Sequence, residues 1–182
     1  MSIDLSSCKG VVTDLEKTLV DLVFVDAKVE GKSHYVAING SLEFLNRCLY
    51  KFGRYQTFIL TTAAFETCVK AYVQALNRHQ ALGIIQALCG VQKPLISHFR
   101  IAASCARALL SFPKEEIAYI DDKLDICINA LTYGFGTVVC VNLLDNIQDA
   151  VEKLNEQQQQ IYNEAIETGR LHLACSLSEI VF

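Results

Sequence analysis

The sequence predicts an α/β fold in which a parallel sheet of about five strands carries helices on both faces. Short apolar runs of strand character alternate with segments of helical periodicity from residue 10 to residue 142. This alternation is typical of parallel sheets joined by right-handed crossovers. Of the 182 residues, 52% are hydrophobic and 20% are charged, so one domain with a sizeable core is expected. The expected arrangement is Rossmann-like.

The N-terminal part of the chain is expected to contribute a strand, a hairpin and a helix. The stretch "GVVTD", residues 10–14, predicts a short buried strand. Residues 20–38 alternate in places between apolar and polar side chains, and Gly31 supplies a turn, so a small hairpin or flap is predicted. Residues 41–52 place Leu and Phe side chains at helical spacing behind Ser41, which is expected to be the N-cap.

Strands and helices then alternate as far as residue 142. The expected strands are the apolar stretches "QTFILTT", "LGIIQALCG", "EIAYIDD" and "GTVVCVN". The helices expected between them are "AAFETCVKAYVQALNRH", "HFRIAASCARALL" and "DICINALTYGF", the last of which stops at Gly134. Because parallel strands need helical crossovers, this order places the carboxyl ends of all the strands at one edge of the sheet.

The last forty or so residues have a different pattern. One long amphipathic helix is predicted over "DNIQDAVEKLNEQQQQIYNEAIET", with Gly169 ending it, and "LHLACSL" then alternates like a strand. We therefore expect a core over residues 1–143, with the helix and a possible edge strand of residues 144–182 packed on it. The apolar ending "EIVF" is unusual for a free terminus and suggests a longer parent protein.

Composition argues against several classes of protein. The net charge of −4 and the pI of 5.5 lack the basic excess of nucleic-acid binders, so no nucleic-acid partner is expected. No apolar stretch is long enough to span a bilayer, and the first residues lack the apolar segment of a secretory signal. The eight cysteines form no C-x-x-C pair, so we expect reduced core thiols and a cytoplasmic location.

Polar side chains gather where the predicted strands end. In open α/β sheets this edge is where ligands bind. The side chains expected there, in chain order, are Asp14, Glu16, Thr61, Thr62, Lys93, Asp121, Asp122 and Asp125. Acids this close together raise one another's pKa unless a cation lies among them. Oxygen ligands of this kind favour Mg²⁺ over zinc.

This set of groups suits phosphoryl transfer. Asp14 can attack phosphorus to give an aspartyl-phosphate, and Mg²⁺ offsets the charge repulsion between the carboxylate and the phosphate. Lys93 and a Thr hydroxyl can hold the other phosphate oxygens. The register of the strand favours Thr61 for this role, and Thr62 lies beside it. Glu16 can protonate the leaving oxygen and later take a proton from the attacking water.

Four stretches that carry these residues resemble the motifs of the haloacid-dehalogenase-like (HAD) phosphohydrolases. The stretch "DLEKT" resembles the first motif, D-x-D-x-T, and "TFILT" resembles the apolar strand that ends in Ser or Thr, here Thr61. "VQKPL" supplies the Lys of the third motif as Lys93, and "IAYIDDKLD" resembles the acidic strand end of the fourth. All four occur in family order. Response-regulator receiver domains use similar groups, but their paired acids come first in the chain, so they do not fit.

The resemblance implies a metal site and a general acid. In the family the metal is held by the nucleophile, by the backbone carbonyl of the second acid and by an acid after the fourth strand. These positions match Asp14, Glu16 and Asp122, with Asp121 beside them. Asp125 lies four residues after Asp121 and leaves the register of the last motif open, although Asp122 is favoured. The family's second acid is usually Asp, and the longer Glu16 can overshoot or fold back to the distance of about 2.6–3.2 Å that proton transfer requires.

The spacing of the motifs also bears on the substrate. Residues 18–57 and 62–93 leave no room for the cap domain that family members acting on small metabolites often carry. An open pocket resembles that of members acting on macromolecules, so a Mg²⁺-dependent phosphatase acting on a phosphoprotein, at phosphotyrosine in particular, is predicted. One alternative is an inactive HAD-fold module for binding or assembly. Another is a small-metabolite phosphatase whose lid comes from a neighbouring subunit, in a homo-oligomer formed through the C-terminal helix.

Overall fold

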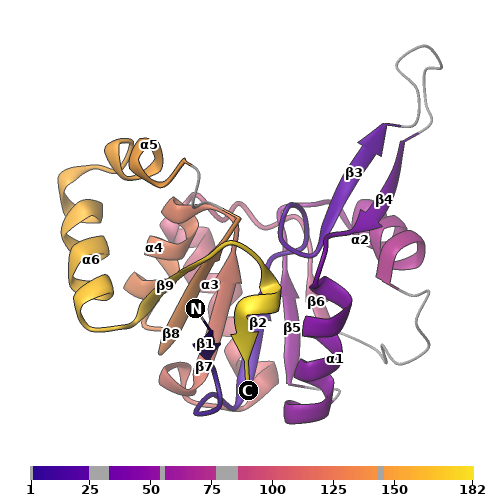
Figure 1. Ribbon diagram of the computed structural model, residues 1–182, viewed down its shortest axis with the longest axis horizontal. Helices are drawn as coiled ribbons and strands as arrows, with labels where there is room; N and C mark the ends of the chain where they lie inside the picture. The colour runs from indigo at the N-terminus through magenta and orange to yellow at the C-terminus, as the bar shows by residue number, and fades with distance from the viewer. Residues whose placement is uncertain (1, 25–32, 54–55, 77–85, 143–145) are drawn as a thin grey trace.

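A six-stranded parallel sheet forms the centre of the molecule (Figure 1). The structure is a computed structural model, and it describes residues 2–24, 33–53, 56–76, 86–142 and 146–182. The strands, in their order across the sheet, are β6 (Gln86–Leu88), β5 (Thr57–Leu60), β2 (Gly10–Thr13), β7 (Ile117–Asp121), β8 (Thr137–Val141) and β9 (Leu171–Ala174). Every neighbouring pair is parallel. The predicted fold class is confirmed, and the sheet has one strand more than expected.

Helices cover both faces of this sheet, and each face has its own apolar core. Val11 packs in the core on one side and Val12 in the core on the other, because successive strand residues point to opposite faces. The first core includes side chains of α1 (Ser41–Phe52) and α2 (Phe65–Ala71). The second includes side chains of α3 (Ile96–Leu110), α4 (Leu124–Tyr133) and α6 (Glu156–Glu167).

The chain order reverses at β2, in the middle of the sheet. From β2 the chain proceeds to β5 and β6 on one side and then to β7, β8 and β9 on the other. Such a reversal opens a crevice at the carboxyl ends of the two strands involved. Asp14 directly follows β2 and Asp121 is the last residue of β7, so the fold places both acids at this crevice.

A hairpin rises above the sheet beside the crevice (Figure 1). Its strands β3 (Val20–Phe24) and β4 (Ser33–Ala37) are antiparallel, with Leu22 opposite Tyr35. The predicted hairpin or flap is therefore present. Its expected turn residue, Gly31, lies outside the described residues.

The prediction of one long helix in the tail is wrong, because the chain forms α5 (Ile147–Glu152) and then α6. Asn155 starts the second helix with a capping box. Its side chain accepts a hydrogen bond from the Gln158 N–H at 2.9 Å, and the Gln158 side chain accepts one from the Asn155 N–H at 3.1 Å. Gly169, with φ of 67°, follows the end of α6 as predicted.

Two further local predictions differ from the structure. The N-cap of α1 is Gly40, with φ of 85°, and not Ser41, whose hydroxyl instead donates to the carbonyl oxygen of Ile38 at 2.7 Å. The helix expected over residues 63–79 is seen as α2 followed by a π-helical turn, Tyr72–Leu76. Residues 77–85, with the start of the expected third strand, lie outside the described residues.

The two ends of the chain lie together. Strands β1 (Ile3–Asp4) and β10 (Ile180–Val181) form a small parallel sheet. The ring of Phe182 lies 5.1 Å from that of Phe52 and 6.1 Å from that of Phe44, measured between centroids. The apolar ending therefore packs against α1.

The eight cysteines are all free thiols. Cys8, Cys48, Cys68, Cys127 and Cys140 are buried, and these five agree with the prediction of core thiols, whereas Cys105 and Cys175 are exposed. Within the described residues, none of the helices combines the length and the apolar character needed to cross a bilayer.

Candidate active site

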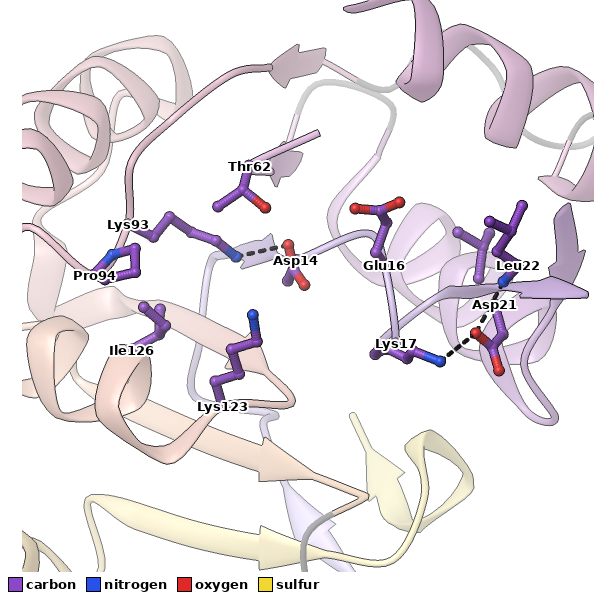
Figure 2. Close-up of a pocket in the computed structure, with 11 residues that line it drawn as sticks. Asp14, Glu16, Lys17, Asp21, Leu22, Thr62, Lys93, Pro94, Lys123 and Ile126 are labelled. Carbon is purple, nitrogen blue, oxygen red and sulfur yellow. Dashed lines mark hydrogen bonds and ion pairs between the residues drawn. The ribbon is translucent and has the colours of Figure 1, made fainter. Parts of the chain in front are cut away.

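A buried lysine joins the two acids at the crevice. The Lys93 ammonium donates to Asp14 Oδ1 at 2.6 Å (Figure 2). It also donates to Asp121 Oδ2 at 2.7 Å. Their exposed fractions are 3%, 5% and 0%. The residues belong to segments far apart in the sequence, and the parallel pairing of β2 with β7 brings the two carboxylates to one side of the lysine.

Two residues that sequence reasoning missed hold this arrangement in place. The buried Tyr119 hydroxyl donates to Asp121 Oδ2 at 2.8 Å. The Asn129 amide of α4 donates to the carbonyl of Lys93 at 3.1 Å and fixes the backbone that carries the lysine. Tyr119 lies two residues before Asp121 on β7, and this spacing was the signal in the sequence, because alternate strand residues share a face.

Three carboxylates lie together at this point, and Lys93 is bonded to two of them. Asp14, Asp121 and Asp122 each offer an oxygen within 4.8 Å of the others'. Burial, and then the charge of Asp121, raise the pKa of Asp14 to about 7, although Lys93 opposes the shift. The same two causes raise the pKa of Asp122 to about 6. Burial lowers the pKa of Lys93, but the charges of Asp121 and Asp14 outweigh it and leave that pKa raised.

The residues present fit a divalent cation. With all three acids ionised, negative charge remains in excess even when the ammonium groups of Lys93 and Lys123 are both counted, and a divalent cation would offset it. Asp122 Oδ1 is buried and has no hydrogen-bond partner within the described part of the chain. A buried oxygen of this kind is costly unless it is bound, and hard carboxylate oxygens are the ligands that Mg²⁺ prefers. Asp125, the other acid left open by the sequence, is exposed on α4 and is not in this cluster.

Glu16 lies on the opposite side of Asp14 from Lys93 (Figure 2). A turn in which Lys17 has φ of 64° directs the chain from β2 into β3. The half-buried Glu16 carboxylate accepts a hydrogen bond from the Tyr35 hydroxyl of β4 at 3.1 Å. Lys17 points to Asp21 instead, with a distance of 2.6 Å between its Nζ and Asp21 Oδ1.

The two threonines predicted to bind phosphate differ in position. Thr61 is fully buried, and its hydroxyl accepts a hydrogen bond from the N–H of Ala63 at 3.1 Å. Thr62 is exposed and lies in the wall of the pocket above Asp14 (Figure 2). The structure thus brings Thr62 to the pocket surface and directs the Thr61 hydroxyl to the start of the following helix.

Asp14, Glu16, Thr62 and Lys93 line one pocket of about 380 Å³. Its lining carries three acids and three lysines, and its walls come from the hairpin, from the loop after β6 and from the start of α4. The lining residues are Asp14, Glu16, Lys17, Val20, Asp21, Leu22, Thr62, Lys93, Pro94, Lys123 and Ile126. No cap domain covers the pocket among the described residues.

Comparison with known proteins agrees with the fold. No protein-family model and no curated protein matches the chain. Among solved structures, 3-deoxy-D-manno-octulosonate 8-phosphate phosphatase from Moraxella catarrhalis, in complex with a magnesium ion, a phosphate ion and KDO, is similar over 75% of this chain and 69% of that one, at 18% identity and a TM-score of 0.52. The cobalt-bound deoxy-D-mannose-octulosonate 8-phosphate phosphatase from Haemophilus influenzae matches 80% of this chain and 76% of that one, at 19% identity and a TM-score of 0.53.

A third similar structure is a Legionella pneumophila protein assigned to the HAD superfamily (subfamily III A) hydrolases. It is similar over 86% of this chain and 71% of that one, at 20% identity and a TM-score of 0.52. The chain therefore has the fold of the HAD phosphohydrolases, as the resemblance of its four motifs implied.

Proposed function

We propose that the protein is a Mg²⁺-dependent phosphoric monoester hydrolase that uses Asp14 as its nucleophile. The observation that carries the proposal is the cluster of Asp14, Asp121 and Asp122, two of which bond Lys93, with a buried oxygen of Asp122 that has no partner among the described residues. Asp14, Asp122 and the backbone carbonyl of Glu16 would hold the metal, with Asp121 beside them. When bound, Mg²⁺ supplies charge neutralisation between the phosphate and the nucleophile.

The residues of the pocket account for each step. A carboxylate oxygen of Asp14 attacks phosphorus, and the bond from phosphorus to the leaving oxygen breaks, which gives an aspartyl-phosphate. Glu16 donates a proton to that leaving oxygen. Glu16 then takes a proton from water as the water attacks phosphorus, the bond from phosphorus to Asp14 breaks, and phosphate leaves. The Lys93 ammonium orients Asp14, and Lys93 and Thr62 hold the phosphate oxygens, with Thr61 behind them.

The substrate class separates two versions of this function. The pocket of about 380 Å³ suits a small phosphorylated molecule, and two of the similar structures are phosphatases of a sugar-acid phosphate. These observations favour a small phosphate monoester. A phosphoprotein substrate, with phosphotyrosine in particular, remains the second candidate, because no cap covers the pocket among the described residues. The homo-oligomer through the C-terminal helix stays a prediction.

Phosphate release from 4-nitrophenyl phosphate tests the proposal. Turnover should require Mg²⁺ and should be lost in Asp14→Asn, whereas the matched change Asp149→Asn on the exposed face of α5 should leave it intact. Asp122→Asn should raise the Mg²⁺ concentration needed for half-maximal turnover more than Asp125→Asn does, which decides the register of the fourth motif. Sugar phosphates and phosphopeptides then separate the two substrate classes. No turnover of any of these esters would favour the inactive binding module.

A further inference from the structure

The hairpin contributes a side chain to the chemistry of the pocket through Tyr35. Its hydroxyl donates a hydrogen bond to Glu16 Oε1 at 3.1 Å. Within the described residues, this is the one hydrogen bond that the Glu16 side chain makes. Tyr35 is only 9% exposed, and its ring packs in the apolar core on the face of α1 and α2. A carboxylate at the pocket is thus held by a donor that is itself fixed.

Two separate elements fix the position of Tyr35. In the hairpin it lies opposite Leu22, a residue of the pocket wall. Its backbone N–H also donates to the side-chain oxygen of Gln74 at 2.9 Å, and Gln74 belongs to the π-helical turn after α2. The hydroxyl therefore cannot follow Glu16 if that side chain changes its rotamer, and Glu16 gains the contact in one orientation.

The chemistry of the hydrogen bond suits a group that donates and accepts protons in turn. The Tyr35 hydroxyl occupies one carboxyl oxygen of Glu16 and leaves the other for proton transfer. A protonated carboxyl still has an acceptor oxygen, so the contact persists in both protonation states of Glu16. An Asp at position 16 would end one methylene short of this hydroxyl. The length of the Glu16 side chain therefore matches the position of the Tyr35 hydroxyl.

We propose that Tyr35 is a positioning residue that holds the general acid Glu16 in its productive orientation. This inference rests on the proposed phosphatase function and deepens it. It also gives the hairpin a role, since the side chain that orients the acid comes from β4 and not from the segment that carries the acid.

The dependence on the leaving group tests the inference. An alkoxide leaves only with a proton from the acid, whereas 4-nitrophenolate leaves readily without one. In Tyr35→Phe, kcat/KM for β-glycerophosphate should fall about tenfold to a hundredfold, as expected for a displaced catalytic group. For 4-nitrophenyl phosphate it should change by less than about threefold. Tyr50→Phe is the matched control, because Tyr50 is 96% exposed on α1.

A double-mutant cycle isolates the contribution of the contact between Tyr35 and Glu16. In the Glu16→Asp background the carboxylate ends short of the hydroxyl, so Tyr35→Phe should change kcat/KM for β-glycerophosphate by no more than about twofold. Thermal unfolding shows whether Tyr35→Phe keeps its fold. Gln74→Leu offers a second route. Gln74 is exposed, and its replacement removes the hydrogen bond that holds the backbone N–H of Tyr35. This variant should show the same selective loss on the alkyl ester.

The outcomes separate the inference from the function on which it rests. Equal losses on the two esters, no loss on either, or a full effect of Tyr35→Phe in the Glu16→Asp background would each overturn the role of Tyr35 while leaving the phosphatase in place. Absence of Mg²⁺-dependent turnover of both esters by the wild-type protein would overturn the proposed function, and the role of Tyr35 with it.

Discussion

Replacing the proposed nucleophile should make the metal-free protein more stable. Asp14 is 5% exposed, shares its lysine with Asp121, and has a pKa raised to about 7 by burial and by that neighbouring charge. A carboxyl whose pKa is raised in the folded state contributes stability that is present at low pH and is lost as the pH rises toward that pKa. Asn cannot ionise, so Asp14→Asn avoids this loss.

The magnitude follows from the difference between about 7 and the ordinary value of 3.8. At about 1.4 kcal/mol for each pKa unit, ionising Asp14 costs the folded state up to roughly 4 kcal/mol. Lys93 keeps Asp121 as a partner in the variant, so no unpaired buried cation results. For a chain of this size, each kcal/mol corresponds to about 2–4 °C in the unfolding midpoint. We therefore expect a rise of several degrees near pH 8 and little change near pH 4.

Thermal unfolding of both proteins in EDTA, across this pH range, measures the effect. The control is Asp21→Asn, because the Asp21 side chain is 40% exposed and its pKa is lowered by the hydrogen bond from Lys17, so no rise is expected. A variant Asp14→Asn that is less stable than wild type near pH 8 would refute the reasoning. It would mean that the ion pair with Lys93 outweighs the burial of the carboxylate.

Four other changes test separate parts of the structure. Lys93→Met leaves the acids facing one another without their cation and should cost about 3–5 kcal/mol of unfolding free energy in urea; a loss under about 1 kcal/mol would contradict the buried pairing. Mg²⁺ should raise the unfolding midpoint more near pH 7.5 than near pH 5.5, because protons compete with the metal for Asp14, and an equal rise at both would argue against a carboxylate site. Asn155→Ala should lose about 1 kcal/mol with its capping box, while the exposed Asn163→Ala on the same helix should not; equal urea midpoints for the two would exclude the cap. Gly136→Ala should cost several kcal/mol, because its Cβ would collide with the carbonyl oxygen of Glu115, and wild-type thermal stability would show that this loop is placed differently.

Local signals in the sequence predict the elements of the tail with unequal success. The long apolar stripe of the tail predicted one helix, although "NEQQ" at Asn155 carries the pattern of a capping box, Asn followed three residues later by Gln. The apolar periodicity continues across residues 153–155, so it does not indicate that α5 ends and α6 begins there. The alternating "LHLACSL" correctly predicts a strand, but its place as the sixth strand, beside β8, depends on a pairing that no local pattern encodes.

The class of fold and the set of chemical groups at one edge of the sheet follow from local features of the sequence. Apolar periodicity and strand order are local properties, and they are enough to predict that Asp14, Lys93 and Asp121 follow or end strands at one edge of the sheet. The way in which those groups meet depends on the packing of the folded chain. The sharing of Lys93 between two acids and the contact from Tyr35 to Glu16 join residues distant in the chain, and such contacts depend on packing, which sequence spacing does not specify.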